Sequence, residues 1–192
     1  MALQKVKTGI SVEDYLESEK ISPTKHEFVE GEVYAMAGAS DNHNLLAGEF
    51  YGLLYIQLRD SKCQPFIGDI KVRVSSSVVY YPDVLVSCEE NPEHPYFRNN
   101  PILIIEVASP STERIDRRVL YYQQMPSLQE YVIVDQYRMN VEIHRRQPNG
   151  GWKTVYFNEP NDVVELTSVD LSIPLPELYR RVRFEQNADR DN

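Results

Sequence analysis

Apolar residues recur along the first third of the chain with two different periods. In two segments they return every three or four positions, which is typical of amphipathic helices beginning near Ser11 and Ser40. Between them, apolar and polar residues alternate around Glu30 and Gly31, a pair typical of a tight β-hairpin turn. The predicted elements are a helix over 11–20, strands over 26–29 and 32–36, and a helix over 40–59.

The rest of the chain reads mainly as strands. They are predicted over 65–74, 78–87, 101–108, 130–135, 139–145 and 152–157. A helix is expected to start after Ser109 and to end before Pro126, and a short helix is expected to follow Pro174. Together these elements predict an α+β fold in which a mixed β-sheet is flanked by helices.

Composition indicates one globular domain. The 192 residues are 42% hydrophobic and 26% charged, so we expect a single domain over 1–184 and a disordered tail over 185–192. No apolar run is long enough to span a bilayer and no signal peptide is evident, which predicts a cytoplasmic protein without a membrane partner. Cys63 and Cys88 have no metal-binding spacing, so we expect free thiols.

The formal net charge of −9 bears on possible partners. Proteins that coat nucleic acid nonspecifically are usually basic, because neutralisation of phosphates dominates their affinity. An acidic enzyme can still reach DNA through a local basic strip, for which Arg114, Arg117 and Arg118 are candidates. The same arginines can equally form a solvated helix face.

Two carboxylates interrupt apolar strands. Asp83 follows Pro82 at the entrance of one predicted strand, and Glu106 lies near the end of a branched apolar run. A buried carboxylate is costly unless it is paired or binds a metal. On neighbouring strands, about 4.8 Å apart, the two could hold one Mg²⁺ or Mn²⁺. The alternative is structural: Asp83 caps a turn and Glu106 pairs with an arginine.

Three other polar residues are candidates for the same site. His43 shares a helix face with Leu46 and Phe50, so it points inward, although such a histidine is more often a hydrogen-bonded core residue. Glu27 belongs to the predicted hairpin and can reach the same cleft. Lys71 lies on the polar face of a predicted strand.

Taken in order, these features resemble the Uma2 (DUF820-like) family of restriction-endonuclease-like proteins, part of the PD-(D/E)xK nuclease superfamily. The resemblance covers roughly residues 10–180. The matching segments are 12–16, 25–32, 37–40 with His43, 82–84, 105–112, 116–117 and 126–131. The combination of Pro-Asp-Val at 82–84 with Glu-Val-Ala-Ser-Pro-Ser-Thr at 106–112 is its most specific part.

The resemblance implies a restriction-endonuclease-like core with an N-terminal helix and hairpin extension. It also implies that Asp83 and Glu106 bind the metal, together with the main-chain carbonyl of Val107. The superfamily's catalytic lysine would fall at Ala108, and in Uma2-like proteins it lies on the following helix instead. This chain has no lysine on that helix and offers Arg118 there.

That departure affects the expected chemistry. Lysine can lose its proton when buried, whereas arginine stays protonated and is a poor general base. Arg118 could therefore stabilise negative charge, and Lys71 is a second candidate to replace the missing lysine.

The predicted function is a metal-dependent endonuclease that hydrolyses nucleic-acid phosphodiester bonds. We expect DNA as substrate, Mg²⁺ or Mn²⁺ as cofactor and a homodimer. The predicted catalytic residues are Asp83, Glu106, Arg118, Lys71, His43 and Glu27. Two alternatives stay open: a weak or inactive nuclease-fold protein that acts as a binding module, and a hydrolase of a small phosphate ester.

Overall fold

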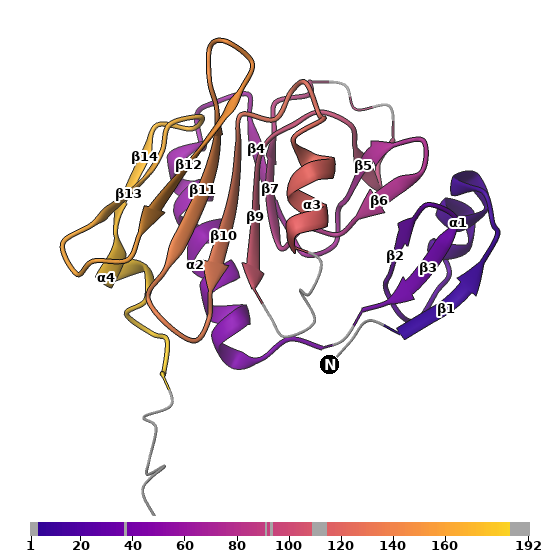
Figure 1. Ribbon diagram of the computed structural model, residues 1–192, viewed down its shortest axis with the longest axis horizontal. Coiled ribbons are helices and arrows are strands. Elements are labelled where there is room, and N and C mark those ends of the chain that lie inside the picture. The colour runs from indigo at the N-terminus through magenta and orange to yellow at the C-terminus, as the bar shows by residue number, and fades with distance from the viewer. Residues whose placement is uncertain (1–3, 37, 91, 93, 109–114, 185–192) are drawn as a thin grey trace, which may run out of the picture.

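The computed structural model describes residues 4–36, 38–90, 92, 94–108 and 115–184. Within them the strands form two six-stranded sheets and one two-stranded sheet (Figure 1). The N-terminal sheet has the order β1 (Gln4–Thr8), β3 (Glu32–Ala35), β2 (His26–Val29), β6 (Val78–Tyr80), β5 (Lys71–Ser75) and β8 (Phe97–Arg98). The central sheet has the order β12 (Trp152–Phe157), β11 (Val141–Arg146), β10 (Glu130–Asp135), β9 (Pro101–Ala108), β7 (Val84–Ser87) and β4 (Gln64–Ile67).

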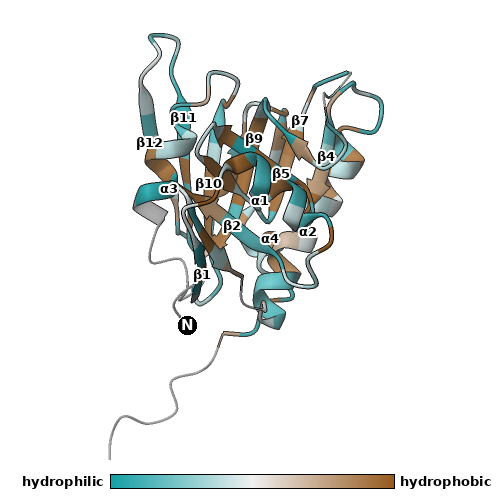
Figure 2. Ribbon diagram, turned by 90° about the vertical axis from the view of Figure 1, so that its right-hand side faces the viewer, coloured by the Kyte–Doolittle hydropathy of each residue, from teal (hydrophilic) through white to brown (hydrophobic). Residues whose placement is uncertain are grey.

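Strand β9 lies in the middle of the central sheet and is covered on both faces, as its apolar run predicts. It pairs parallel with β10 and antiparallel with β7. Leu103 and Ile105 pack into one hydrophobic cluster, while Ile104 packs into another on the opposite face. Figure 2 shows the same distribution, with hydrophobic residues concentrated on the central strands.

Helices complete the layers. Helix α2 (Asp41–Gln57) packs on one face of the central sheet through Leu46, Phe50 and Leu54. Helix α3 (Ile115–Tyr122) lies toward the N-terminal sheet, where Tyr122 joins the cluster on the other face (Figure 1). Helix α1 (Val12–Glu19) covers the hairpin of β2 and β3. The observed fold is thus α+β, and the helix and hairpin predicted at the N-terminus are confirmed.

Local signals fixed several element boundaries. The Ser11 and Ser40 side chains accept hydrogen bonds from backbone N–H groups of the first turns of α1 and α2. At the hairpin turn Glu30 and Gly31 both have positive φ, 51° and 82°, as a two-residue turn of this type requires.

Two predicted strands are wrong in the same way. The chain over 65–74 forms β4 and β5, and the chain over 78–87 forms β6 and β7, with one member of each pair in each sheet. Gly68, with a φ of 67°, breaks the first, and Pro82 breaks the second because proline cannot donate to a sheet ladder. Between residues 65 and 87 the chain therefore crosses between the sheets twice, and Asp83 lies at the second of these crossings.

Other elements were not predicted or were shorter than predicted. β1 and β8 add edge strands, and β13 (Val163–Leu166) pairs with β14 (Leu171–Pro174) beside the short helix α4 (Leu175–Leu178). α3 begins at Ile115; residues 109–114, including Arg114, and the predicted tail lie outside the described residues. No helix in the described ranges is both long and apolar enough to cross a membrane.

The two cysteines form a disulfide, so the expectation of free thiols is wrong. Cys63 immediately precedes β4 and Cys88 immediately follows β7. Because β4 and β7 pair antiparallel with Gln64 opposite Ser87, the two cysteines become cross-strand neighbours. A separation of 25 residues in sequence gave no hint of this register.

Candidate active site

Asp83 and Glu106 are brought together by the pairing of β7 with β9. Val84 lies opposite Ile105 in this antiparallel ladder, so the next position along places Asp83 opposite Glu106. The prediction that the two carboxylates lie on adjacent strands is therefore confirmed. Asp83 lies just outside β7, where the chain arrives from the N-terminal sheet.

The Asp83 carboxylate is held by two groups. Its Oδ2 accepts a hydrogen bond of 2.7 Å from the backbone N–H of Val107. The same oxygen lies 3.2 Å from Nε2 of His43, near the start of α2. His43 thus points inward, as its helical position predicted, and its partner is the carboxylate of the candidate site.

Glu106 and Glu27 share one arginine. Arg118 Nη1 donates to Glu106 Oε1 at 2.6 Å, and Nη2 donates to both oxygens of Glu27 at 2.6 and 2.7 Å. All three side chains are at least nine-tenths buried. Arginine suits this position because its rigid fork of donors can engage two carboxylates at once.

Aromatic residues surround the two buried ion pairs that Arg118 forms. The Arg118 guanidinium lies 4.8 Å from the Tyr80 ring centroid, and the Tyr122 hydroxyl donates to Glu106 Oε1 at 3.1 Å. Tyr131 packs against Tyr122 with ring centroids 5.0 Å apart. These tyrosines were not predicted as site residues, although Tyr122 follows Arg118 by four positions and so shares its helix face.

Charge in the site is unbalanced. Asp83, Glu106 and Glu27 are three carboxylates, and Arg118 is the permanent cation that faces them. Burial raises the pKa of Glu106 to about 7; Arg118 opposes this rise, whereas Asp83 and Glu27 add to it. Burial would lower the pKa of His43, but its hydrogen bond to Asp83 and the charges of Asp83 and Glu106 outweigh burial and raise it.

Lys71 lies apart from these residues. It begins β5 in the N-terminal sheet, and its Nζ lies 5.0 Å from the centroid of the Tyr81 ring. The charges that act on it are those of Glu19, Asp69 and Lys25, and neither Asp83 nor Glu106 is among them. Of the six residues predicted to be catalytic, five form one connected group and Lys71 belongs to another.

The donor set fits a hard divalent cation. Asp83 Oδ1 and Glu106 Oε2 form no hydrogen bond within the described residues, so each carboxylate keeps one oxygen available. No group of three or more His, Cys, Asp or Glu side chains in the described ranges could hold a metal by itself. That is compatible with Mg²⁺, which typically takes one or two carboxylates and keeps several waters.

Comparison with known proteins agrees with this fold. A crystal structure described as "a putative nuclease belonging to DUF820", from Anabaena variabilis, superposes with a TM-score of 0.74 over 90% of this chain and 98% of that one. At 19% identity the likeness establishes a shared nuclease-like fold.

Sequence comparison identifies the family. Residues 12–176 match the profile of Uma2, described as "Putative restriction endonuclease". Two uncharacterized proteins of Synechocystis sp. are similar: slr1290 at 31% identity over 91% of this chain and 94% of its own, and sll1609 at 32% over 82% and 93%. The chain belongs to the Uma2 family.

Proposed function

We propose that this protein is a metal-dependent nuclease that hydrolyses phosphodiester bonds of DNA. The observation that supports this most strongly is that Asp83 lies opposite Glu106 across β7 and β9, each with one oxygen that forms no hydrogen bond with the described residues. Membership of the Uma2 family supports a nucleic-acid substrate.

Asp83, Glu106 and the main-chain carbonyl of Val107 are the proposed ligands of Mg²⁺ or Mn²⁺. A bound cation would activate a water and offset negative charge at the phosphate. Among the described residues of the site, carboxylates outnumber buried cations, which favours the binding of a positive ion.

The remaining residues of the site prepare these ligands. His43 and the Val107 N–H fix the orientation of Asp83, while Arg118 and Tyr122 fix that of Glu106. Arg118 is buried and donates to two carboxylates, so its positive charge acts on the site through Glu106. Because arginine keeps its proton, we assign it no role as a base.

A second candidate function is a nuclease-fold binding module with weak or no activity. The observation that favours it is the position of Arg118, whose Nη1 already occupies Glu106 Oε1 at 2.6 Å. An internal cation that neutralises Glu106 reduces the need for a metal there. No lysine lies at Ala108, and Lys71 lies elsewhere.

Cleavage of supercoiled plasmid in Mn²⁺ separates the two functions. We expect the wild-type protein to nick the plasmid, and Asp83→Asn and Glu106→Gln to lose this activity while remaining folded. Glu130→Gln is the matched control, because Glu130 is also a buried glutamate paired with an arginine, Arg145, but lies outside the site. Metal binding without cleavage by the wild type would favour the binding module.

A further inference from the structure

Two ammonium groups converge on one tyrosine next to the candidate site. Lys71 Nζ lies 5.0 Å and Lys25 Nζ 5.8 Å from the centroid of the Tyr81 ring. Burial lowers the pKa of Lys71; the charges of Glu19 and Asp69 oppose this effect, and the charge of Lys25 adds to it. Tyr81 precedes Asp83 by two positions, so the residue that both lysines face lies close along the chain to the proposed metal ligand.

Lys71 lacks the partner that a buried lysine normally has. The residue is 5% exposed, yet its ammonium forms no hydrogen bond or ion pair within the described residues. The Nζ atom itself is not fully enclosed, so the tip of the side chain reaches solvent. An ammonium that is mostly enclosed, that lacks a side-chain partner and whose tip still reaches solvent is well placed to take an anion from solution.

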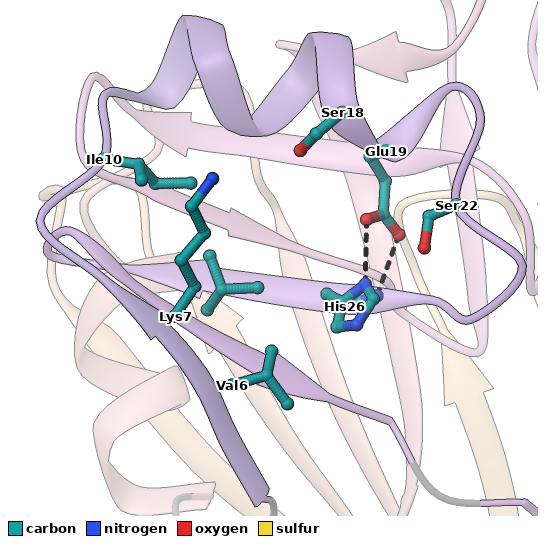
Figure 3. Close-up of a pocket in the computed structure, with 8 residues that line it drawn as sticks. Val6, Lys7, Ile10, Ser18, Glu19, Ser22 and His26 are labelled. Atoms are coloured by element: carbon teal, nitrogen blue, oxygen red, sulfur yellow. Dashed lines mark hydrogen bonds and ion pairs between the residues drawn. The ribbon is translucent and has the colours of Figure 1, made fainter.

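Glu19, the carboxylate whose charge acts most strongly on Lys71, does not meet this need, because it is already engaged. Glu19 accepts hydrogen bonds from the backbone N–H of His26 at 2.8 Å and from the Tyr81 hydroxyl at 3.2 Å. Its other oxygen lies 3.1 Å from Nδ1 of His26. Figure 3 shows both contacts between Glu19 and His26. The two residues line a pocket of about 250 Å³ together with other residues of α1, β2 and their neighbours.

Lys25 lies at the more open edge of the pair. Its side chain is 47% exposed, and it forms an ion pair with Asp69, itself 81% exposed. It also donates to the Gly68 carbonyl at 3.0 Å, while the Gly68 N–H donates to the Asp83 carbonyl at 2.9 Å. A single residue, Gly68, therefore connects Lys25 to the backbone of the proposed metal ligand.

We propose that Lys71 and Lys25 bind a phosphate of the nucleic-acid backbone beside the phosphate that is cleaved. This subsite rests on the proposed nuclease function and adds a determinant of substrate position to it. Lys71 lies at its floor and Lys25 at its rim. The subsite lets a chain with a net charge of −9 hold a polyanion close to its carboxylates.

The test is the salt dependence of oligonucleotide binding. A fluorescein-labelled DNA duplex is titrated with protein in Ca²⁺ at several salt concentrations. For Lys71→Gln we expect about tenfold weaker binding and a loss of about one unit in the slope of log K against log[salt]. Lys25→Gln should reduce the affinity and the slope by smaller amounts. Lys71→Arg keeps the positive charge and should retain the wild-type slope.

The matched control is Lys62→Gln. Lys62, like Lys25, is an exposed lysine near an acidic partner, Glu90, and it lies at the opposite end of the β4–β7 pair from Asp83. The Lys62→Gln variant should bind the duplex with the wild-type slope of log K against log[salt]. Unfolding curves for all variants separate lost contacts from lost structure.

The outcomes separate the subsite from the nuclease function. If Lys71→Gln binds DNA with wild-type affinity and slope while the wild type cleaves plasmid, the subsite is wrong and the function stands. If the wild type neither binds the duplex nor cleaves, both are wrong. Asp83→Asn that binds DNA but does not cleave, together with a reduced slope for Lys71→Gln, supports both.

Discussion

Arg118 and Lys71 are two buried cations that lie over the rings of neighbouring tyrosines, Tyr80 and Tyr81, and they differ in the partners that surround them. Arg118 donates to two carboxylates and lies over Tyr80, so its charge is matched entirely from within the protein. Lys71 has an aromatic face, Tyr81, but no carboxylate within ion-pair distance among the described residues.

The difference shows that burial alone does not define the role of a charged side chain. A cation whose partners are internal orients those partners and stabilises the fold. A cation without internal partners lowers the stability of the protein until a ligand supplies the missing charge. We therefore assign Arg118 to positioning Glu106 and Lys71 to binding the substrate.

The largest expected effect is on stability. Arg118→Met should lower the free energy of unfolding by about 3–5 kcal/mol, because it leaves Glu27 and Glu106 buried without their partner. Urea denaturation measures this change. Adding Glu27→Gln to the variant should recover part of the lost free energy of unfolding. An Arg118→Met protein as stable as the wild type would show that these ion pairs do not stabilise the fold.

Tyr122→Phe should have the next largest effect. It removes the hydroxyl that donates to Glu106 Oε1, and hydrogen bonds to charged groups contribute about 1.5–3 kcal/mol. Tyr121→Phe is the control, since the neighbouring hydroxyl donates to exposed Glu30. Equal stabilities of the two variants in urea would contradict the assigned role of Tyr122.

Metal affinity should depend on pH. Because burial raises the pKa of Glu106 to about 7, a proton competes with a cation for this carboxylate below that pH. The affinity for Mn²⁺ should therefore rise by up to about tenfold per pH unit up to about pH 7 and level off above it. Calorimetry at four pH values measures this; a constant affinity from pH 5.5 to 8 would exclude Glu106 as a titrating ligand.

Lys71→Met should have the smallest effect on stability. It removes a cation–π contact and also a desolvated charge, so we expect a change within about 1 kcal/mol at pH 7. Burial lowers the pKa of Lys71, so the folded state binds this proton less tightly than the unfolded chain. The wild type should therefore gain stability relative to Lys71→Met as the pH rises toward 10.5, which urea denaturation at pH 7 and 10 can check.

Much of this arrangement was predictable from local sequence. The caps at Ser11 and Ser40, the Glu30-Gly31 turn and the inward position of His43 follow from short-range rules. The adjacency of Asp83 and Glu106 followed from the intervening loop and the apolar strand. The family resemblance pointed to Arg118, whose two carboxylate partners the structure identifies.

The rest depended on which sheet each strand joins. A single strand over 65–74 would have placed Lys71 in the same sheet as β7, but Gly68 breaks the strand and β5 joins the N-terminal sheet. The Cys63–Cys88 disulfide likewise depends on the register of β4 against β7, which no local pattern specifies. Both wrong predictions, the single strand over 65–74 and the free thiols, therefore concern features that depend on long-range strand pairing.

The most direct test of the central claim is calorimetric titration of Mn²⁺ into the wild type and an Asp83→Asn/Glu106→Gln double variant. The account predicts one binding event in the wild-type protein and none in the double variant, with both folded. Absence of binding in the wild type, or equal binding in both, would contradict it and leave Asp83 and Glu106 as structural residues.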